Sequence, residues 1–338
     1  MRNLLQDSVE RLLADAVTPE MLHAAEAGIW PVDLWADVEA LGLPLAGVSE
    51  DFGGTGARWT EIFVVIRACG RTAAPLPLPE AIFANSLLAT AGLQPPENGP
   101  IVFASGSHGD ALKAIPWGRH APWLVLHEPA RGLIGLHSLA DAEIIPGVNI
   151  AGEPRDTIRL ATGSLQAEAA FGGDVDAIRA GGAMLRSAQI AGALERLTDM
   201  SATYANERIQ FGRAIGKFQA VQQQLAVLAT QAAAAGAAAE TAFLRADAAF
   251  DSLAPAAAKA VASEAAAKAA EIAHAIHGAL GFTHEHNLHF LTRRLWAWRD
   301  EYGSDAFWAD HLGRTLAPLG AAGLWPRITA VLPETTAP

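Results

Sequence analysis

The chain has little cysteine and few charged residues. Cys69 is the only cysteine among 338 residues, so no internal disulfide can form, which indicates a reducing compartment. Charged residues make up 18% and hydrophobic residues 51%, a composition that excludes wholesale disorder. Asp and Glu number 36 against 24 Lys and Arg, and the resulting net charge of −12 disfavours binding to nucleic acid.

The pattern of a secretory leader or a membrane segment is also missing. The first residues, MRNLLQDSVERLLADA, carry acids early and have no apolar core of the signal-peptide type. The longest uncharged stretch, residues 218–239, is long enough to span a bilayer. It is mostly alanine with five glutamines, which is a poor composition for a membrane helix. We therefore expect a cytoplasmic protein that does not bind membranes.

Proline is almost absent from the second half of the chain. Fourteen of the nineteen prolines lie at or before Pro154, and Pro255 is the only one between residues 155 and 317. Because proline breaks helix interiors, long helices can form only in the second half. The alanine-rich run 232–270 favours helix, and four long helices with short links predict a bundle. Apolar residues at three- and four-residue spacing mark its core-facing stripes: Ile190, Leu194, Leu197 and Tyr204, then Val221, Leu225 and Leu228.

The first half divides into two regions of different pattern. Residues 1–97 predict short helices broken by turns, including a buried helix over 61–69 that ends at Gly70. Residues 98–172 carry short apolar or alternating runs separated by Gly, Pro or Asp, which is typical of a small antiparallel β-domain. The predicted fold class is mostly α with a small β-domain. Its order is an N-terminal helical domain (1–97), a short β-domain (98–172) and a C-terminal four-helix bundle (173–338).

The most informative segment is Tyr204 to Gln222, YANERIQFGRAIGKFQAVQ, a turn between two long helices. A purely structural interpretation explains part of it, because Arg208 and Arg213 complement a helix C-terminus and glycine ends the helix. That interpretation does not explain why arginine, phenylalanine and several amides share one turn. These residue types suit a dinucleotide, since Arg pairs with pyrophosphate, Phe supplies an apolar wall and Gln bonds ring edges.

This segment resembles the acyl-CoA dehydrogenase family, whose pattern is Tyr-Ala-x-x-Arg-x-x-Phe-Gly followed by Phe-Gln. Residues 35–54 (WADVEALGLPLAGVSEDFGG) resemble the family's N-terminal stretch, with Ser49 in place of a proline, and residues 276–285 (IHGALGFTHE) resemble its late glycine motif. The resemblance implies FAD and oxidation of an acyl-CoA thioester at the α,β bond, with a glutamate removing the α-proton. It also implies FAD contacts from two segments: Arg208, Gln210, Phe211, Gly212, Phe218 and Gln219 in the turn, and His277, Gly278 and Gly281 in the glycine loop.

The catalytic base is out of register with the family. Many members place the glutamate in a Tyr-Glu-Gly-Thr motif, but here Tyr302 occupies the base position and Glu301 lies one residue early. One residue rotates a side chain by about 100° on a helix. Other members carry the base on the first bundle helix, where this chain has Gly181 and Gly182. Glu301 is therefore the candidate catalytic residue, in a displaced position.

The β-domain also departs from the family. It lacks the Thr-Glu-Pro-x-x-Gly-Ser-Asp motif that normally contacts the flavin ring, and the chain is short mainly in this region. Ala183 stands near the place of an arginine that commonly contacts the CoA nucleotide, which leaves Arg179 and Arg186 as substitutes. With these departures the chain resembles the short subunit of heterotetrameric bacterial acyl-CoA dehydrogenases. In those enzymes one of two related chains carries the base.

Two functions remain open at this point. The first is an acyl-CoA dehydrogenase-like flavoprotein that forms a homo- or hetero-oligomer with a related chain. The second is a non-catalytic structural subunit that completes the FAD site of such a partner. In either case we expect the chain alone to show weak or no acyl-CoA dehydrogenase activity, because the glutamate is displaced.

Histidines gather late in the chain, with five of them between residues 274 and 289. Glu271 and His274 have the Glu-x-x-His spacing of di-iron bundles, but the only other copy, Glu20 with His23, lies outside the predicted bundle. A lone motif of this kind is a weak signal. The sequence therefore predicts a polar loop here and no metal site.

Overall fold

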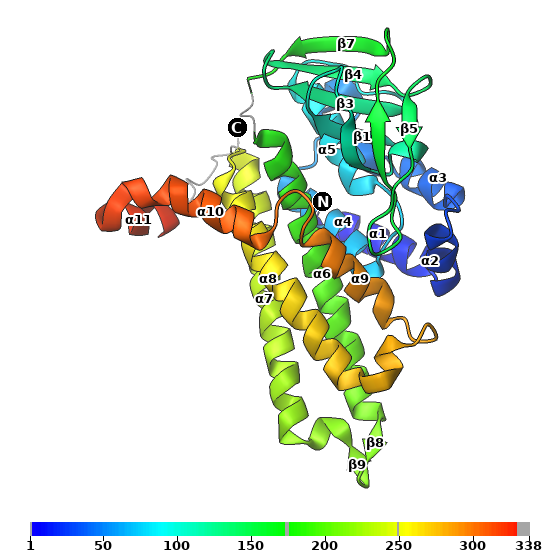
Figure 1. The fold of residues 1–338 in the computed structure, drawn as a ribbon, viewed down its shortest axis with the longest axis vertical. Coiled ribbons are helices and arrows are strands. Elements are labelled where there is room, and N and C mark those ends of the chain that lie inside the picture. Colours follow the sequence, from blue (N-terminus) through cyan, green and yellow to red (C-terminus); the bar gives the residue numbers. More distant parts are fainter. Residues whose placement is uncertain (1, 173–175, 249, 330–338) are drawn as a thin grey trace.

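The computed structural model describes residues 2–172, 176–248 and 250–329, which form three regions in chain order (Figure 1). The first region is helical, and Thr18 caps its second helix by accepting a hydrogen bond from the Met21 amide at 3.3 Å. Gly42, at φ 67°, follows the third helix and leads into a 3-10 turn over Leu43–Leu45. The helices are α1 (Arg2–Ala16), α2 (Pro19–Glu26), α3 (Val32–Ala40), α4 (Trp59–Thr72) and α5 (Leu78–Thr90), with a second 3-10 turn at Glu50–Phe52.

Helix α4 is buried and crosses α6 (Ala177–Glu207) very closely. A Cβ atom on Gly70 would come within 2.0 Å of the Gln189 carbonyl oxygen, and one on Gly192 within 1.9 Å of the Arg67 carbonyl oxygen. The predicted end of this helix at Gly70 is therefore wrong, since α4 continues to Thr72. Gly70 permits the close approach of two backbones and does not mark a turn.

The β-region holds two small sheets. One is four-stranded in the order β1 (Ile101–Ser105), β3 (Trp123–Glu128), β4 (Leu133–Ser138), β7 (Leu165–Ala170), and the other is three-stranded in the order β2 (Leu112–Pro116), β6 (Arg155–Arg159), β5 (Glu143–Ile145). All pairs are antiparallel, as predicted, except that β1 and β3 are parallel. Because β2 leaves for the other sheet between them, the chain crosses over before β3 and no hairpin joins the two strands. The prediction of a purely antiparallel β-domain is wrong for this pair.

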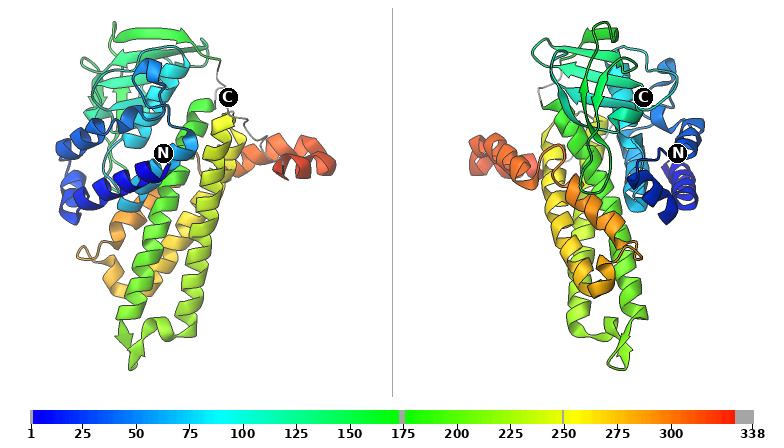
Figure 2. Two further views of the ribbon diagram at one scale, coloured as in Figure 1. Left: turned by 180° about the vertical axis from the view of Figure 1, so that it is seen from behind. Right: turned by 45° about the vertical axis from the view of Figure 1, so that its right-hand side comes forward.

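The C-terminal region confirms the predicted bundle. Helices α6, α7 (Gln219–Ala248), α8 (Leu253–His277) and α9 (Leu288–Trp298) pack around a core of alanine, leucine and isoleucine. A hairpin of β8 (Ile209–Gln210) and β9 (Arg213–Ala214) joins α6 to α7 at one end of the bundle, and the two sheets lie near the other end (Figure 2). Helix α10 (Asp305–Leu316) packs on α8, and α11 (Gly320–Thr329) follows it.

The proposed domain limits at 97/98 and 172/173 remain predictions. The first lies between α5 and β1, while residues 173–175 at the second, 249 within the bundle and 330–338 at its end lie outside the described residues. Helix α7 is the described helix that is long and apolar enough to cross a membrane by composition. Its buried residues, such as Leu228 and Phe243, pack against the other helices of the chain.

Candidate functional site

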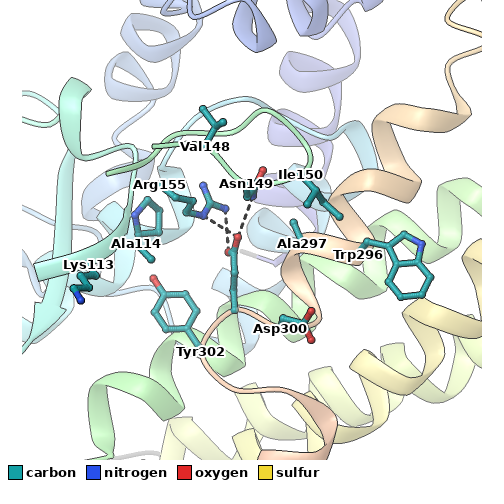
Figure 3. Close-up of a pocket in the computed structure, with 12 residues that line it drawn as sticks. Lys113, Ala114, Val148, Asn149, Ile150, Arg155, Trp296, Ala297, Asp300 and Tyr302 are labelled. Carbon is teal, nitrogen blue, oxygen red and sulfur yellow. Dashed lines mark hydrogen bonds and ion pairs between the residues drawn. The ribbon is translucent and has the colours of Figure 1, made fainter. Parts of the chain in front are cut away.

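A cleft opens between the β-region and the loop that follows α9 (Figure 3). Its larger part has a volume of about 620 Å³ and its smaller part about 310 Å³. Val148, Ile150 and Trp296 form an apolar wall of the larger part, and each is exposed. Both parts share four residues from β2 and the α9–α10 loop: Lys113, Ala114, Pro116 and Tyr302. An apolar concavity with a few polar groups is the usual form of a ligand site.

Strand β2 shapes one wall of this cleft through a bulge. Its register against β6 shifts between Leu112 and Ile115, and Ala114 within the bulge has a φ of 55°. A bulge bends a strand and redirects its side chains, and bulges are common beside functional sites. The bulge therefore places Lys113 and Ala114 at the point where the two parts of the cleft meet.

Glu301 lines the cleft, and both of its carboxylate oxygens accept hydrogen bonds. Arg155 donates from Nε to Oε1 at 2.8 Å and from Nη2 to Oε2 at 3.0 Å, and Arg186 Nε donates to Oε2 at 2.7 Å. Asn149 Nδ2 adds a fourth hydrogen bond to Oε1 at 3.0 Å. Burial alone would raise the pKa of Glu301, but Arg155 and Arg186 hold it well below its usual range. A carboxylate held in this way is a weak proton acceptor.

Tyr302, which the family resemblance places at the base position, has a partly buried ring and a strained backbone conformation. Its backbone has a φ of 56°, and its ring stacks on Phe103 with centroids 5.7 Å apart. Gly182 of α6 makes room for it, since a Cβ there would lie 2.3 Å from Tyr302 Cδ1. The hydroxyl is buried and has no partner among the described residues, and burial raises the pKa of this phenol. A phenol of high pKa can donate a hydrogen bond but is a poor base.

Glu301 belongs to a network of eight charged residues that extends from the cleft into the protein. Four arginines and four glutamates alternate along it, so their formal charges cancel. They come from α2 and α5, from the segment between β5 and β6 and the start of β6, and from α6, α9 and the loop after it. The order is Arg293, Glu26, Arg294, Glu153, Arg155, Glu301, Arg186 and Glu80. Because a buried ion is costly without its partner, this network fixes the three regions relative to one another.

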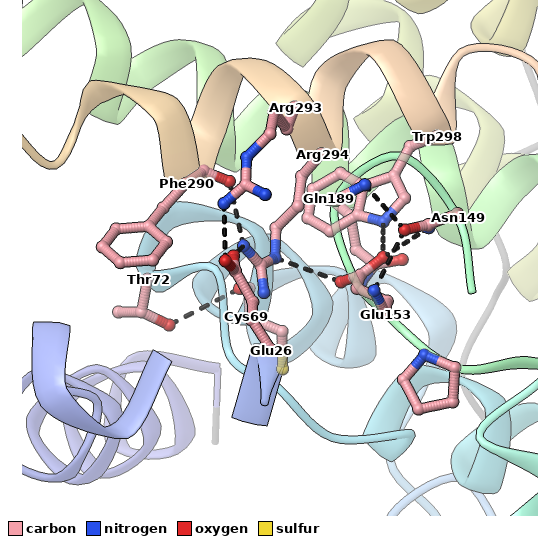
Figure 4. Close-up of polar contacts among 12 residues, drawn as sticks. Glu26, Cys69, Thr72, Asn149, Glu153, Gln189, Phe290, Arg293, Arg294 and Trp298 are labelled. Carbon is pink, nitrogen blue, oxygen red and sulfur yellow. Dashed lines mark hydrogen bonds and ion pairs between the residues drawn. The ribbon is translucent and has the colours of Figure 1, made fainter. Parts of the chain in front are cut away.

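Glu153 occupies the middle of the network (Figure 4). It accepts hydrogen bonds from Arg155 Nη2 at 3.0 Å, from Arg294 Nε at 3.1 Å and from Trp298 Nε1 at 3.0 Å. Burial would raise the pKa of Glu153, but Arg155 and Arg294 lower it. Sequence reasoning missed Glu153 and Arg155, because no local motif marks them and their partners on α9 and in the loop after it are more than a hundred residues away.

The two arginines suggested for the CoA nucleotide lie in different surroundings. Arg186 is buried and pairs with Glu80 through Nη2 at 2.7 Å in addition to Glu301, so its guanidinium is already in use. Arg179 lines the smaller part of the cleft, where it pairs with Asp176 at 3.3 Å and covers the ring of Phe307. Of the two, only Arg179 presents a cation to the cleft.

The predicted FAD turn forms the β8–β9 hairpin, at the end of the bundle away from the two sheets (Figure 1). Phe211 and Gly212 are its two central residues, with φ of 50° and 76°, as a type I′ turn requires. Phe211 is 91% exposed, and the Arg213 guanidinium lies 4.1 Å from the centre of the Phe218 ring, which is half-buried. The remaining predicted contacts, Arg208, Gln210 and Gln219, are exposed.

The predicted glycine loop lies at this same end. Tyr204, four residues before Arg208, stacks on His277 with centroids 4.5 Å apart and donates its hydroxyl to the His277 carbonyl at 3.3 Å. Gly278 is exposed, and Gly281 is buried where a Cβ would come within 3.0 Å of His277 and Leu288. The structure thus brings the two predicted FAD segments together at one end of the bundle, away from Glu301.

These two segments fit the nucleotide half of FAD chemically. Arg208 and Arg213 have no ion-pair partner among the described residues, so their charges are available to a pyrophosphate. Phe211 offers an exposed apolar face, and Gln210 and Gln219 offer amides. His277 Nε2 is buried without a partner among the described residues. Because the hairpin projects from the end of the bundle, a ligand bound there would remain accessible to a second chain.

A buried lysine supports the loop that carries Glu301 and Tyr302. Lys259 of α8 donates from Nζ to the carbonyls of Arg299 at 2.7 Å and Gly303 at 2.8 Å, and to Ser263 Oγ at 3.0 Å. Burial lowers the pKa of Lys259 to about 7. Sequence reasoning passed over this residue because the alanine-rich helix gives no sign that one lysine points inward.

Glu271 and His274, the pair with Glu-x-x-His spacing, each have another partner in the structure. Glu271 pairs with the neighbouring Lys268 at 3.1 Å, and His274 Nε2 lies 3.1 Å from Thr292 Oγ1. Cys69 is buried, and burial raises the pKa of its thiol to about 12, so it is an inert core residue.

Two family models match the sequence. The acyl-CoA dehydrogenase N-terminal domain covers residues 2–94, and the acyl-CoA dehydrogenase C-terminal domain covers residues 180–316. Two curated relatives carry the name Acyl-CoA dehydrogenase IpdE2. The one from Mycobacterium tuberculosis is 30% identical over 323 residues, covering 87% of this chain and 90% of its own, and the one from Mycolicibacterium smegmatis is 28% identical over 310 residues, covering 87% and 91%.

Solved structures share the fold. The ChsE4-ChsE5 complex from Mycobacterium tuberculosis matches with a TM-score of 0.84 at 21% identity, covering 94% of this chain and 97% of the other. The Tcur3481-Tcur3483 steroid ACAD variant matches with a TM-score of 0.82 at 21% identity, covering 95% and 98%. Butyryl-CoA dehydrogenase from Megasphaera elsdenii matches with a TM-score of 0.76 at 17% identity, covering 93% and 98%.

Proposed function

Because the chain belongs to the acyl-CoA dehydrogenase family, we propose that it works as one chain of a hetero-oligomeric acyl-CoA dehydrogenase. In this assembly it helps to hold FAD, and a related chain supplies the catalytic base. Two of the structural neighbours named above are described with paired chains. One is the ChsE4-ChsE5 complex, and the other carries the paired name Tcur3481-Tcur3483. The resemblance of this chain to the short subunit of such assemblies supports the same arrangement.

The observation that best supports the proposal is that both carboxylate oxygens of Glu301 already accept hydrogen bonds. A base for the α-proton of a thioester needs a carboxylate with a free lone pair and a pKa near the working pH. Glu301 accepts four hydrogen bonds from Arg155, Arg186 and Asn149, and the two arginines lower its pKa. Tyr302, one residue on, has a raised pKa. We infer that Glu301 is a structural carboxylate and that neither residue acts as the base.

The hairpin and the glycine loop supply the second part of the proposal. Bound FAD would supply the hydride acceptor that oxidation of an acyl-CoA requires. Arg208, Gln210, Phe211, Gly212, Phe218 and Gln219 would contact its nucleotide half together with His277, Gly278 and Gly281. Since these residues lie at the end of the bundle away from the two sheets, they serve a site completed by the partner chain. Exposed Phe211 would then be buried on assembly.

A second candidate function is that the chain oxidises an acyl-CoA in its own cleft. The observation that favours it is the cleft itself, whose larger part has a volume of about 620 Å³ and is lined by Tyr302. The Tyr302 hydroxyl has no hydrogen-bond partner among the described residues. In this alternative Glu301 would have to leave Arg155 and Arg186 before it could accept a proton.

Co-expression with a related acyl-CoA dehydrogenase chain from the same organism distinguishes the two functions. The chain is purified alone and as the co-expressed complex, and each sample is measured for native mass, flavin absorbance and dye-linked oxidation of acyl-CoAs. The proposal predicts weak or no oxidation by the lone chain, and a yellow, active complex that contains both chains. Robust oxidation by the lone chain, abolished by Glu301→Gln, would overturn it in favour of the second candidate.

A further inference from the structure

Three potential metal ligands from opposite ends of the chain meet where α2 contacts α9. His23 and Glu26 lie one helical turn apart on α2, and His289 is the second residue of α9. One ligand atom of each residue lies within 4.8 Å of the others. We propose that His23, Glu26 and His289 bind a divalent transition-metal ion, with zinc as the best fit. This site lies apart from the cleft and from the hairpin, and the proposal does not depend on the proposed function.

His289 is already oriented as a metal ligand. Its Nδ1 lies 2.9 Å from the His286 carbonyl oxygen, and since a carbonyl only accepts, this nitrogen must carry the hydrogen. The lone pair is therefore on Nε2, which is buried and has no partner among the described residues. Metal-binding histidines usually have this arrangement, with one ring nitrogen held by a backbone carbonyl and the other directed at the ion.

His23 provides the open side of the site. Its ring packs edge-on against Phe290 with centroids 4.8 Å apart, and its centroid lies 5.8 Å from that of His289. These contacts keep the ring near His289, although the residue is exposed. An ion from solution can therefore reach the three ligands without a rearrangement of the fold.

Glu26 is held in place by the charge network. Its Oε2 accepts from Arg293 Nη2 at 2.6 Å, while its Oε1 makes only a long contact of 3.4 Å to Arg294 Nη1 (Figure 4). Arg294 is also paired with Glu153, which offsets part of its charge. Glu26 can therefore offer Oε1 to a cation while Arg293 orients the carboxylate. Arg293 and Arg294 already place positive charge beside Glu26, so they weaken its attraction for a metal ion.

The chemistry of the three side chains determines which kind of metal ion they would bind. Two imidazoles and one carboxylate form a three-ligand set that zinc uses with water in its fourth position. Hard ions such as calcium and magnesium prefer six or more oxygen ligands, which this group lacks. Bound zinc would connect the N-terminal helices to the bundle at a point where the ion pairs of Glu26 already do so. The sequence predicts no metal site because it shows His23 only as part of a Glu-x-x-His pair and gives no sign that α2 meets α9.

The experiment is a titration of the metal-free full chain with Zn²⁺ by calorimetry and with Co²⁺ by visible absorbance. We expect one equivalent of each ion to bind, with a rise in the thermal unfolding temperature in Zn²⁺. His289→Ala and His23→Ala should each weaken binding at least about tenfold, as expected for loss of a ligand. His311→Ala, on α10, is the matched control and should bind like the wild type.

The unfolding temperature of each metal-free variant shows that it has folded, and His289→Gln serves as a second variant if His289→Ala does not fold. Binding that persists unchanged in folded His23 and His289 variants would overturn the proposal. The absence of saturable binding to the wild type would overturn it as well.

Discussion

Replacement of Glu301 by glutamine is the perturbation that most clearly distinguishes a structural carboxylate from a catalytic one. Glutamine keeps the size of the side chain and one acceptor oxygen but removes the charge. Arg155 and Arg186, whose side chains are 7% and 1% exposed, would then lose the anion that they share. Arg186 would retain Glu80, and Arg155 would retain Glu153. We therefore predict a destabilised chain.

The magnitude follows from the burial of the two arginines. Breaking a buried ion pair by removing one partner costs about 3–5 kcal/mol, and the retained acceptor oxygen and remaining glutamates favour the lower end, about 3 kcal/mol. In a chain of this size about 2 °C accompanies each kcal/mol, so the unfolding temperature should fall by about 6 °C. Asp300→Asn is the matched control, because Asp300 is 69% exposed and should change stability by less than about 0.5 kcal/mol.

The pH dependence has a defined sign. Since the folded-state pKa of Glu301 is lowered, its contribution to stability is present above the pKa of an unfolded glutamate. It is lost as the pH falls below about 4.5. The wild type should therefore lose more stability than Glu301→Gln on acidification through that range. Urea unfolding of both proteins at several pH values measures the difference.

The assay that refutes this reasoning is acyl-CoA oxidation by the co-expressed complex. Loss of a true base reduces the rate by about 10²–10⁴-fold. A complex with Glu301→Gln that keeps its stability but loses activity to that extent would show that Glu301 is catalytic. Reduced stability with activity retained at temperatures where the complex is folded is the result that we expect.

Three further predictions concern the surroundings of Glu301. Gly182→Ala should destabilise the chain by about 1–3 kcal/mol in thermal unfolding, because the new Cβ would lie 2.3 Å from the Tyr302 ring. Gly236→Ala on α7 is the control, since a Cβ there would have no neighbour within 4 Å, and it should be neutral or stabilising by up to about 1 kcal/mol. Tyr302→Phe removes a buried hydroxyl that has no partner among the described residues, so its free energy of unfolding should equal or exceed that of the wild type; a large loss would reveal a hidden partner. Burial lowers the pKa of Lys259 to about 7, so above that pH the lysine is protonated in the unfolded chain but neutral in the folded chain. The stability of the wild type relative to Lys259→Met, measured by urea unfolding, should therefore rise between about pH 7 and 9. A fall in this difference would contradict the direction of the pKa shift.

The general fold could be predicted from the sequence because its signals are local. Proline is confined almost entirely to the first half and near the C-terminus, which marks out the long helices, and apolar stripes on α6 and α7 identify the faces that pack in the bundle. The turn between α6 and α7 could be predicted for the same reason, since Gly212 and Gly216 interrupt the helical pattern locally. That Phe211 and Gly212 form a two-residue hairpin is seen only in the structure.

What could not be predicted depends on contacts between distant residues. The parallel pairing of β1 with β3 is set by where β2 goes, which no strand pattern records. Gly70 has the same local appearance as a helix stop, but its role is set by Gln189 of α6. The partners of Glu301 lie 115 and 146 residues away, so the sequence alone shows only a displaced glutamate.

The β8–β9 hairpin is the part of this chain that would help to complete the FAD site. The measurement is the ratio of bound flavin to protein in the co-expressed complex with wild-type chain, with Arg208→Ala and with the exposed control Arg314→Ala on α10. We predict a full flavin complement for the wild type and the control, and a marked loss of flavin for Arg208→Ala in a complex that still contains both chains. Unchanged flavin content in the Arg208→Ala complex would contradict the claim that this chain helps to hold the cofactor.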